Sequence, residues 1–425
     1  MSATKHAIDA IESVTAQRFD ELVDRFAPSV RTMITPDVLR AGWTTATVAL
    51  GAYVGMGEPI EEPVAAGMVL VKVPVTFTGG EVVALVTVTG NGELAGLQLA
   101  PAEEMARQGE GWQPPSYAET SAFVEHELTL GSDALAVPGT LTVPVGDGPW
   151  PAVVVLPGSG PTDRDSTIGP NKPLKDLAWG LASQGVAVLR FDKVTHAHPA
   201  EVRADRNFTV LDEYRAAAVA AVAELVARKE INSDRIVLLG HSLGGTVAPR
   251  IAAEVPELAG LVLFAAGAEP LYWAAIRQVR YIAELDPATA THAESVLATM
   301  TEQARRVDDP ALTADTPAAS LPFGQPAPYW LDLRDHDPVD AAAALRMPML
   351  VVNGGRDYQV TIADDLARWR AGLADRADVT IREYPADNHL FFPGDKPSTP
   401  AEYQQLQHVD DTVIADIADW INSQV

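Results

Sequence analysis

One serine stands in a sequence pattern that can turn a hydroxyl into a nucleophile. Ser242 is the central residue of the run GHSLG at 240–244, which follows the apolar run Ile236–Leu239 and precedes a helix-forming segment. At such a tight strand-to-helix turn the serine has strained backbone angles, and its hydroxyl projects at the helix N-terminus, where developing negative charge is stabilised. In a chain with 31 glycines the pattern alone is a weak signal. Its place between a strand and a helix is what predicts a nucleophile rather than an ordinary glycine-rich turn.

A nucleophilic serine requires a base that takes its proton and an acid that orients the base. Asp357 follows the predicted strand Met349–Asn353, and His389 follows the last predicted strand, Val379–Tyr384. The order Ser, Asp, His, each after a strand, is typical of one large class of acyl-transfer enzymes. We therefore predict Ser242 as the nucleophile, His389 as the general base and Asp357 as the acid.

Other residues could take the two partner roles. His241 is a weaker base, because a residue beside the nucleophile in sequence points elsewhere from the turn. Asp335, Asp337 and Asp387 are weaker acids, the first two because they lie in an inserted segment. An isolated aspartate after a Gly-Gly turn is often a capping residue, and an isolated histidine in a polar loop is usually just exposed. Their positions after successive strands favour the functional interpretation of the predicted acid and base.

Acyl transfer also needs two backbone N–H donors for the oxyanion that forms in the transition state. We predict the N–H of Leu243 as one donor. The second is predicted to be the N–H of Ser159, in the loop PGSG at 157–160 that follows the predicted strand Ala152–Leu156. The alternative for this loop is a flexible connection without a catalytic role.

Short apolar runs alternate with helical segments from about residue 120 to the C-terminus. Continuous apolar runs of this length are typical of parallel strands that are covered on both faces. The predicted strands are 152–156, 186–191, 235–239, 258–265, 349–353 and 379–384. The predicted fold class is therefore α/β, a doubly wound sheet whose strand ends carry the candidate residues.

The alternation stops between residues 268 and 346, and we predict that this segment forms a lid. It begins with helical patterns and then becomes rich in proline. Because it interrupts the sheet just after a strand, it should lie over the carboxyl ends of the strands, where ligands bind. Tyr329 and Trp330 are predicted to line the substrate pocket. The alternative is that these aromatic residues only cover the sheet edge.

A different pattern precedes this domain. Apolar residues at helical spacing predict helix in residues 6–40. Apolar residues alternate with other residues from Met68 to Leu99, with glycine-containing turns between the runs, and this pattern predicts an antiparallel meander. Residues 101–117 are rich in Pro, Gly, Gln and Glu, and we interpret them as a linker. We therefore predict a small α+β domain at 1–117 and a catalytic domain at 118–425.

Composition excludes several other functions for this chain of 425 residues. Its net charge of −26 argues against a nucleic-acid partner, because phosphate contacts need clustered Lys and Arg. The chain has no cysteine, which excludes disulfides, thiolate nucleophiles and zinc–thiolate sites. Charged residues interrupt the N-terminal segment, so it contains no apolar core of a signal peptide. The longest apolar run, Leu258–Ala268, is shorter than the ~20 residues that span a bilayer. We expect a cytoplasmic protein without a membrane span; its oligomeric state, a homo-oligomer included, is left open.

One stretch of the second domain resembles a known family. Residues 156–190 are similar to the two-domain bacterial serine esterases of the EstD type, which have the α/β-hydrolase fold, in the run LPGSGPTDRDSTIGPNKPLKDLAWGLASQGVAVLR. The resemblance spans roughly 120–425 and includes the segments 240–245, 328–333, 354–360 and 388–391. The first domain is similar to the small cystatin-like or NTF2-like modules that often precede such hydrolases. The resemblance implies hydrolysis of short- to medium-chain acyl esters of small molecules, without a cofactor or a metal.

One departure from that family is Pro157, which stands where the family usually has histidine in the loop before Ser159. Because the donors are backbone N–H groups, we expect function to survive, and the sequence leaves open how the loop is held without that histidine. A peptidase or an acyltransferase could use the same three residues. A non-catalytic binding protein on the same fold is the alternative outside enzymes, and labelling of Ser242 by a fluorophosphonate would exclude it.

Overall fold

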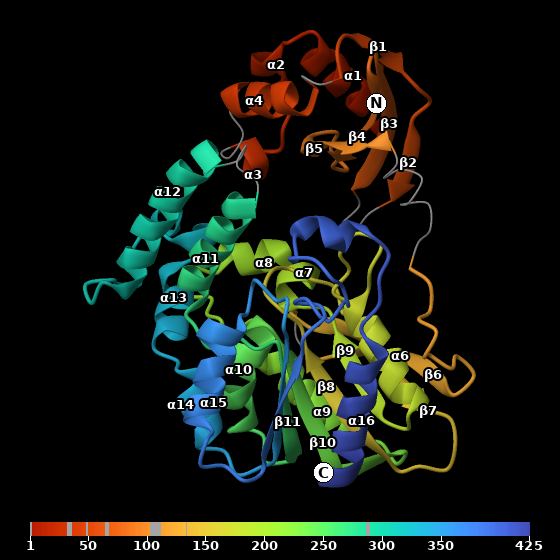
Figure 1. Cartoon of the computed structure of the whole chain (residues 1–425), viewed down its shortest axis with the longest axis vertical. Helices are drawn as coiled ribbons and strands as arrows, with labels where there is room; N and C mark the ends of the chain where they lie inside the picture. Colours follow the sequence, from red (N-terminus) through yellow and green to blue (C-terminus); the bar gives the residue numbers. More distant parts are fainter. Residues whose placement is uncertain are drawn as a thin grey trace. The chain divides into compact units, whose positions relative to one another are not determined.

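The computed structural model of the chain contains two compact units, Met1–Gly111 and Trp112–Val425 (Figure 1). It describes residues 2–31, 36–47, 50–63, 68–102, 112–132, 134–285 and 290–425. Residues 112–117, at the end of the predicted linker, belong to the second unit. Each unit has a hydrophobic core of its own.

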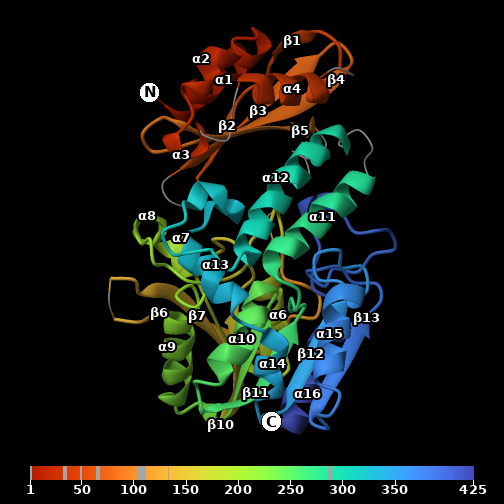
Figure 2. The ribbon, with the colours of Figure 1, turned by 90° about the vertical axis from the view of Figure 1, so that its left-hand side faces the viewer.

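The first unit packs helices on one antiparallel sheet (Figure 2). Its helices are α1 (Ala3–Thr15), α2 (Phe19–Val23), α3 (Pro28–Arg31) and α4 (Pro36–Thr47), and its strands are β1 (Tyr53–Met56), β2 (Ile60–Pro63), β3 (Val69–Phe77), β4 (Gly80–Val88) and β5 (Leu94–Pro101). The strand order is β1-β3-β4-β5, and β2 also pairs with β3. Ile11 and Val14 of α1 join a core with Val73 of β3 and Val86 of β4. The predicted helical segment and meander are confirmed, and β1 and β2 are additional.

The second unit is built on a mostly parallel sheet of eight strands. The strands are β6 (Phe123–Leu130), β7 (Val137–Pro144), β8 (Trp150–Leu156), β9 (Ala187–Phe191), β10 (Ile231–His241), β11 (Leu258–Phe264), β12 (Met349–Gly354) and β13 (Val379–Tyr384). Their order is β13-β12-β11-β10-β8-β9-β7-β6. Neighbours from β13 to β9 are parallel, and β7 and β6 add antiparallel pairs at one edge. The predicted α/β fold is confirmed.

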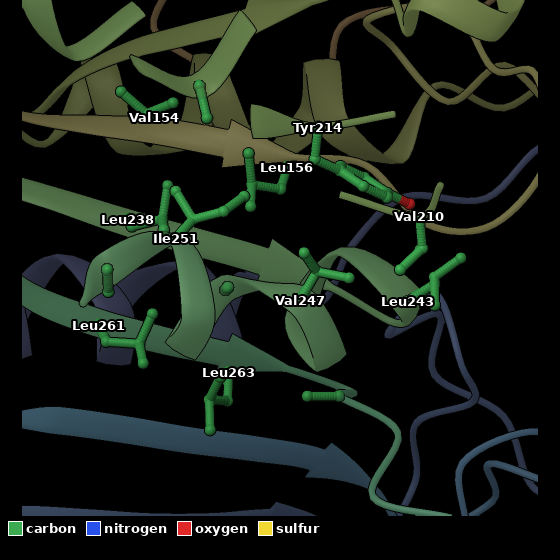
Figure 3. Close-up of a cluster of buried hydrophobic side chains, with 14 of the residues drawn as sticks. Val154, Leu156, Val210, Tyr214, Leu238, Leu243, Val247, Ile251, Leu261 and Leu263 are labelled. Atoms are coloured by element: carbon green, nitrogen blue, oxygen red, sulfur yellow. The ribbon is translucent and has the colours of Figure 1, made fainter. Parts of the chain in front are cut away.

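Helices cover both faces of this sheet (Figure 1). On one face lie α6 (Pro173–Ser183) and α16 (Asp411–Gln424), and on the other lie α9 (Arg215–Val226), α10 (Leu243–Ala252) and α15 (Ala367–Gly372). Successive residues of a strand point to opposite faces. Val153 of β8 therefore packs with the α6 side, whereas Val154 and Leu156 pack with Val247 and Ile251 of α10 (Figure 3). This two-sided burial explains the continuous apolar runs in the sequence.

The order of the strands reverses at β8. The next strand along the chain, β9, lies on one side of β8, and β10 lies on the other, with Leu156 at the end of β8 paired to Gly240 of β10. Ligands of doubly wound sheets bind at the carboxyl ends of the strands beside such a reversal. The loop after β8 carries Ser159 and the turn after β10 carries Ser242, so the fold brings these two segments to the same edge.

The inserted segment between β11 and β12 is largely helical. It contains α11 (Leu271–Leu285), α12 (Ala290–Asp308), the 3₁₀ turns η2 (Ala318–Ser320) and η3 (Pro322–Gly324), α13 (Ala327–Arg334) and α14 (Pro338–Ala343). The sequence predicts the first two helices but not α13 and α14, which lie in the proline-rich part. Pro328 and Pro338 lie in the first turns of these helices. Backbone N–H groups make no intrahelical hydrogen bond in a first turn, so a proline there does not cost the helix a bond.

Short elements complete the second unit. They are α7 (Val194–Ala197) and α8 (Pro199–Ala204) after β9, the π-helical turn η4 (Ile362–Leu366) before α15, and the 3₁₀ turn η5 (Pro400–Gln404) before α16. The predicted acid, Asp357, lies in the turn between β12 and η4. The predicted base, His389, lies in the loop between β13 and η5.

Candidate active site

Ser242 lies at the turn from β10 to α10 in a strained conformation. Its φ of 54° and ψ of −120° lie in a region that residues other than glycine rarely adopt. Such strain persists only where the surrounding structure enforces it, and it is concentrated at functional sites. A Cβ at Gly240 would lie 2.5 Å from the carbonyl oxygen of Gly244. The glycine at this position is therefore required for the close approach of strand and helix.

The first turn of α10 also touches the loop that follows β8. A Cβ at Gly244 would lie 2.5 Å from the carbonyl oxygen of Pro157 and 2.6 Å from that of Leu156. On the same loop, a Cβ at Gly158 would lie 3.3 Å from the Cβ of Ser242. The glycines of the GHSLG motif therefore bring the loop of the predicted oxyanion donor against the predicted nucleophile.

His389 and Asp357 are joined by a short hydrogen bond between buried side chains. The Nδ1 atom of His389 lies 2.7 Å from Oδ2 of Asp357, and the two residues are 4% and 5% exposed. The other carboxylate oxygen of Asp357 accepts from the backbone N–H groups of Gln359 (2.7 Å) and Val360 (2.9 Å). These bonds hold the carboxylate in one orientation, and they leave Nε2 as the histidine nitrogen that is free to exchange a proton.

The loop of His389 is fixed by the residue before it. The Oδ1 atom of Asn388 accepts from the N–H groups of Leu390 (3.0 Å) and Phe392 (3.1 Å), while its Nδ2 atom donates to Glu402 at 2.8 Å. Glu402 also pairs with Arg356, which lies one residue before Asp357. The acid and the base are thus supported by one hydrogen-bonded network.

His241 connects this loop to the strained turn. Its Nε2 atom lies 3.2 Å from the carbonyl oxygen of His389, and the two rings are 4.8 Å apart. Because His241 is adjacent to Ser242, these contacts link the loop of His389 to the turn that carries the predicted nucleophile. Burial, and secondarily the nearby His389, lowers the pKa of His241 to about 3, so that its ring is neutral at ordinary pH.

The alternative acids have other surroundings. Asp337 caps α14, where its carboxylate accepts from the N–H groups of Val339 and Asp340, and Asp335 is exposed beside Arg334. Asp387 is 1% exposed, and within the described part of the chain neither of its carboxylate oxygens has a hydrogen-bond partner. Burial raises the pKa of Asp387 to about 7, and the charge of Asp410 adds to the effect.

The two predicted oxyanion donors have no acceptor within the part of the chain that the structure describes. Among the hydrogen bonds of the described residues, neither the N–H of Leu243 nor that of Ser159 has a partner. Leu243 is the first residue of α10, where a backbone N–H has no intrahelical acceptor. The carbonyl oxygen of Gly158, in contrast, accepts from Lys193 and Tyr214. The sequence analysis missed these two residues, because neither belongs to a recognisable motif.

A cavity of about 1700 Å³ lies over Ser242. Ser159 and Leu243 also line it, and most of the remaining wall comes from the inserted segment. Tyr329 and Trp330, predicted as pocket residues, both border this cavity although they are almost wholly buried. The inserted segment also contributes the side chain of Phe323, which is 61% exposed.

Within the described ranges, no group of three or more His, Asp and Glu side chains is arranged to hold a metal ion. None of the described helices combines the length and apolar character needed to cross a bilayer.

Comparison with protein families gives two matches. The family described as "Alpha/beta hydrolase family" matches residues 153–403. Residues 7–97 match a second family, described as "Protein of unknown function (DUF3887)". The first match lies within the second unit and the second match lies within the first unit.

Individual proteins are also similar to this chain. "Esterase EstD" of Thermotoga maritima is 34% identical over 411 residues, covering 97% of this chain and 93% of that protein. The "2,6-dihydropseudooxynicotine hydrolase" of Paenarthrobacter nicotinovorans is 29% identical over 168 residues, 40% of this chain and 42% of that protein. Among solved structures, an esterase of Pyrococcus furiosus aligns with a TM-score of 0.44 at 16% identity, covering 74% of this chain and 98% of its own.

Proposed function

This chain belongs to the alpha/beta hydrolase family, and we propose that it is a serine carboxylesterase that cleaves short- to medium-chain acyl esters of small molecules. The reaction class is supported by the 34% sequence identity to an esterase, over an alignment that covers 97% of this chain. The observation that carries the mechanism is the buried 2.7 Å bond between Nδ1 of His389 and Oδ2 of Asp357, in a loop that contacts His241 next to the strained turn of Ser242.

The first half-reaction forms an acyl-enzyme. Ser242 Oγ attacks the ester carbonyl carbon, and Nε2 of His389 takes the hydroxyl proton. Asp357 stays ionised and stabilises the imidazolium that forms. The carbonyl oxygen becomes an oxyanion that accepts from the N–H groups of Leu243 and Ser159. The intermediate collapses when the bond to the leaving alcohol breaks, and His389 returns the proton to that alcohol.

The second half-reaction releases the acid. A water molecule attacks the acyl carbon while His389 Nε2 takes one of its protons, and the same backbone N–H groups stabilise the second oxyanion. The bond to Ser242 Oγ then breaks, and the proton on His389 passes to the serine. The products are one carboxylic acid and the regenerated enzyme.

The cavity over Ser242 supports the proposed substrate range. Phe323, Tyr329 and Trp330 give part of its wall an aromatic character, which suits the acyl chain of an ester better than a charged group. We therefore propose that residues 268–346 act as a lid that limits the length of the acyl chain.

The reaction class is tested with matched substrates. Hydrolysis of p-nitrophenyl esters of increasing acyl length is compared with that of the corresponding p-nitroanilides, and with transfer to an added alcohol. We expect ester hydrolysis to dominate and to fall for long chains. Faster turnover of the anilides would identify a peptidase, and preferred transfer to alcohol over water would identify an acyltransferase.

The assignment of the acid is tested with two asparagine variants. Asp357→Asn favours the wrong histidine tautomer, so kcat should fall by about 10⁴-fold. Asp387→Asn is the matched control, because Asp387 lies two positions from His389 but makes no bond to it. If Asp387→Asn is the variant that loses kcat, the assignment of Asp357 is wrong.

A further inference from the structure

The carbonyl oxygen of Gly158 is held by two buried donors. It accepts from Nζ of Lys193 at 2.8 Å and from the hydroxyl of Tyr214 at 3.0 Å. Both donors are 0% exposed, and Tyr214 packs in the core beside the end of β8 (Figure 3). The two bonds occupy both lone pairs of this loop carbonyl oxygen, so its direction is fixed from two sides.

The ammonium group of Lys193 is buried, and each of its N–H bonds has a hydrogen-bond acceptor. Besides Gly158, its ammonium group donates to the hydroxyl of Tyr214 at 3.0 Å and to Oε1 of Glu213 at 2.9 Å. These three acceptors match the three N–H bonds of a protonated lysine. Burial lowers the pKa of Lys193, and the adjacent Glu213 carboxylate opposes that effect. A buried ammonium is costly unless it is paired in this way, so core packing alone does not explain the lysine.

The bonded carbonyl and the predicted oxyanion donor belong to the same peptide group. The C=O of Gly158 and the N–H of Ser159 lie in one plane and point in opposite directions, because the peptide bond is planar and trans. Fixing the oxygen therefore fixes the direction of the N–H. A positive charge at the oxygen also polarises the peptide and makes its N–H a stronger donor. A Cβ at Gly158 would lie 3.3 Å from the Cβ of Ser242, and Ser159 lines the same cavity as Ser242.

We propose that Lys193, with Tyr214, is a positioning residue that aims and polarises the Ser159 N–H toward the oxyanion of the reaction. This inference rests on the proposed function, in which Ser159 supplies one oxyanion donor. Lys193 and Tyr214 would also hold the loop in place when residue 157 is a proline. Lys193 follows β9 and Tyr214 precedes α9, so both donors to Gly158 come from outside the loop.

The same network reaches the wall of the substrate cavity. The second carboxylate oxygen of Glu213 accepts from the hydroxyl of Tyr329 at 3.0 Å, and both residues line the cavity over Ser242. A chain of direct bonds therefore runs from α13 of the inserted segment through Glu213 and Lys193 to the peptide beside Ser242.

The test removes the anchors without touching the loop. Tyr214→Phe deletes one donor to Gly158. Lys193→Met combined with Glu213→Gln deletes the other donor and avoids leaving a buried carboxylate unpaired. Tyr384→Phe is the matched control, because it removes a hydroxyl that bonds Asp416 on α16. Thermal unfolding identifies the variants that fold, and Tyr214→Phe decides the question if the double variant does not.

Two readouts separate positioning from a merely structural role. One is kcat and KM for a p-nitrophenyl ester, and the other is the affinity for an alkyl trifluoromethyl ketone, which adds to the nucleophilic serine and places an oxyanion at the same position. We expect the double variant to lose about 10- to 100-fold in kcat with little change in KM, and to bind the ketone more weakly by a similar factor. Tyr214→Phe should show a smaller loss of the same kind, and Tyr384→Phe none.

The inference and the proposed function fail in different ways. If folded variants bind the ketone with wild-type affinity and keep kcat, while Ser242→Ala is inactive, the role of Lys193 is overturned and the esterase mechanism stands. If Ser242→Ala still turns over esters, the proposed mechanism itself is wrong, whatever the Lys193 variants do.

Discussion

At the residue scale, the peptide between Gly158 and Ser159 gives a prediction that depends on the backbone alone. Ser159→Ala keeps the N–H and should retain kcat/KM within a few-fold, whereas Ser159→Pro removes the N–H and should lower kcat by about 10²- to 10³-fold. The measurement is steady-state ester hydrolysis by both variants after their folding is verified. Equal activity of the two variants would remove Ser159 from the oxyanion site.

Asp387 gives a prediction on the pH dependence of stability. Its pKa rises from an ordinary value of 3.8 to about 7 in the folded protein, so the native state holds a proton that the unfolded chain loses. The stability present below pH 4 is therefore lost as the pH rises through 7, by at most about 4 kcal/mol. Asp387→Asn cannot ionise and should gain stability relative to the wild type between pH 4 and 8.

The measurement is the free energy of unfolding in urea, for wild type and Asp387→Asn, at pH 4, 6 and 8. The buried amide adds a cost that is constant with pH, so the pH trend of the difference carries the result. A difference that stays constant over this range would show that Asp387 does not titrate in it.

Motif-based prediction at this scale has a clear physical limit. Ser242, Asp357 and His389 remain predictions, and the sequence allows them because each follows a strand at which this fold carries such residues. Lys193 could not be predicted, because its partner Gly158 lies 35 residues away and the bond joins two loops. Only the packing of Tyr214 and Glu213 around its ammonium group supports the role that we propose for it.

At the element scale, the inserted segment is predicted to select acyl-chain length. Phe323 is 61% exposed and borders the cavity, so Phe323→Ala should leave the melting temperature unchanged and shift the ratio of kcat/KM between short and medium esters, by roughly 1–3 kcal/mol. Val145 is 59% exposed and lies outside the cavity lining, so Val145→Ala is the matched control. If Phe323→Ala leaves the ratio of kcat/KM between short and medium esters unchanged, the part of the cavity wall formed by Phe323 does not select acyl-chain length.

Trp330 complements that test, because it is fully buried. Trp330→Ala should change the same profile but also lower the free energy of unfolding by about 3–5 kcal/mol, since it leaves a cavity in the core. For this reason the exposed Phe323 is the sharper probe of the lid.

Secondary structure followed from hydrophobic periodicity where the elements are long or buried. The central strands and α11 and α12 agree with the sequence patterns to within a few residues. Helix α9 begins at Arg215, because Thr209 and Asp212 bond each other reciprocally and form a turn before it. The strands β1 and β2 are only four residues long and carry no period that a sequence pattern can detect.

At the scale of the whole molecule, we propose that the second unit begins at Trp112. The indole N–H of Trp112 donates to the buried Asp176 at 2.7 Å, and its ring packs on Trp179. The ring of Tyr117 lies against Gly180. These contacts belong to the catalytic unit although the sequence assigns residues 101–117 to a linker.

The boundary is tested by comparing two shortened proteins, 112–425 and 118–425. Loss of residues 112–117 removes a partner of the buried Asp176 and exposes the surface beneath Tyr117, so 118–425 should be less stable by about 2–4 kcal/mol. Urea unfolding measures the difference. Equal stability would show that these six positions act only as a connection.

Labelling by a fluorophosphonate tests most directly whether Ser242 is the nucleophile, with peptide mass mapping and ester turnover measured on the same samples. We expect one phosphonylated peptide that contains Ser242 and a loss of turnover in step with labelling. In Ser242→Ala we expect no label and a loss of about 10⁴-fold or more in turnover. Labelling of another residue, or wild-type turnover in folded Ser242→Ala, would show that Ser242 is not the nucleophile.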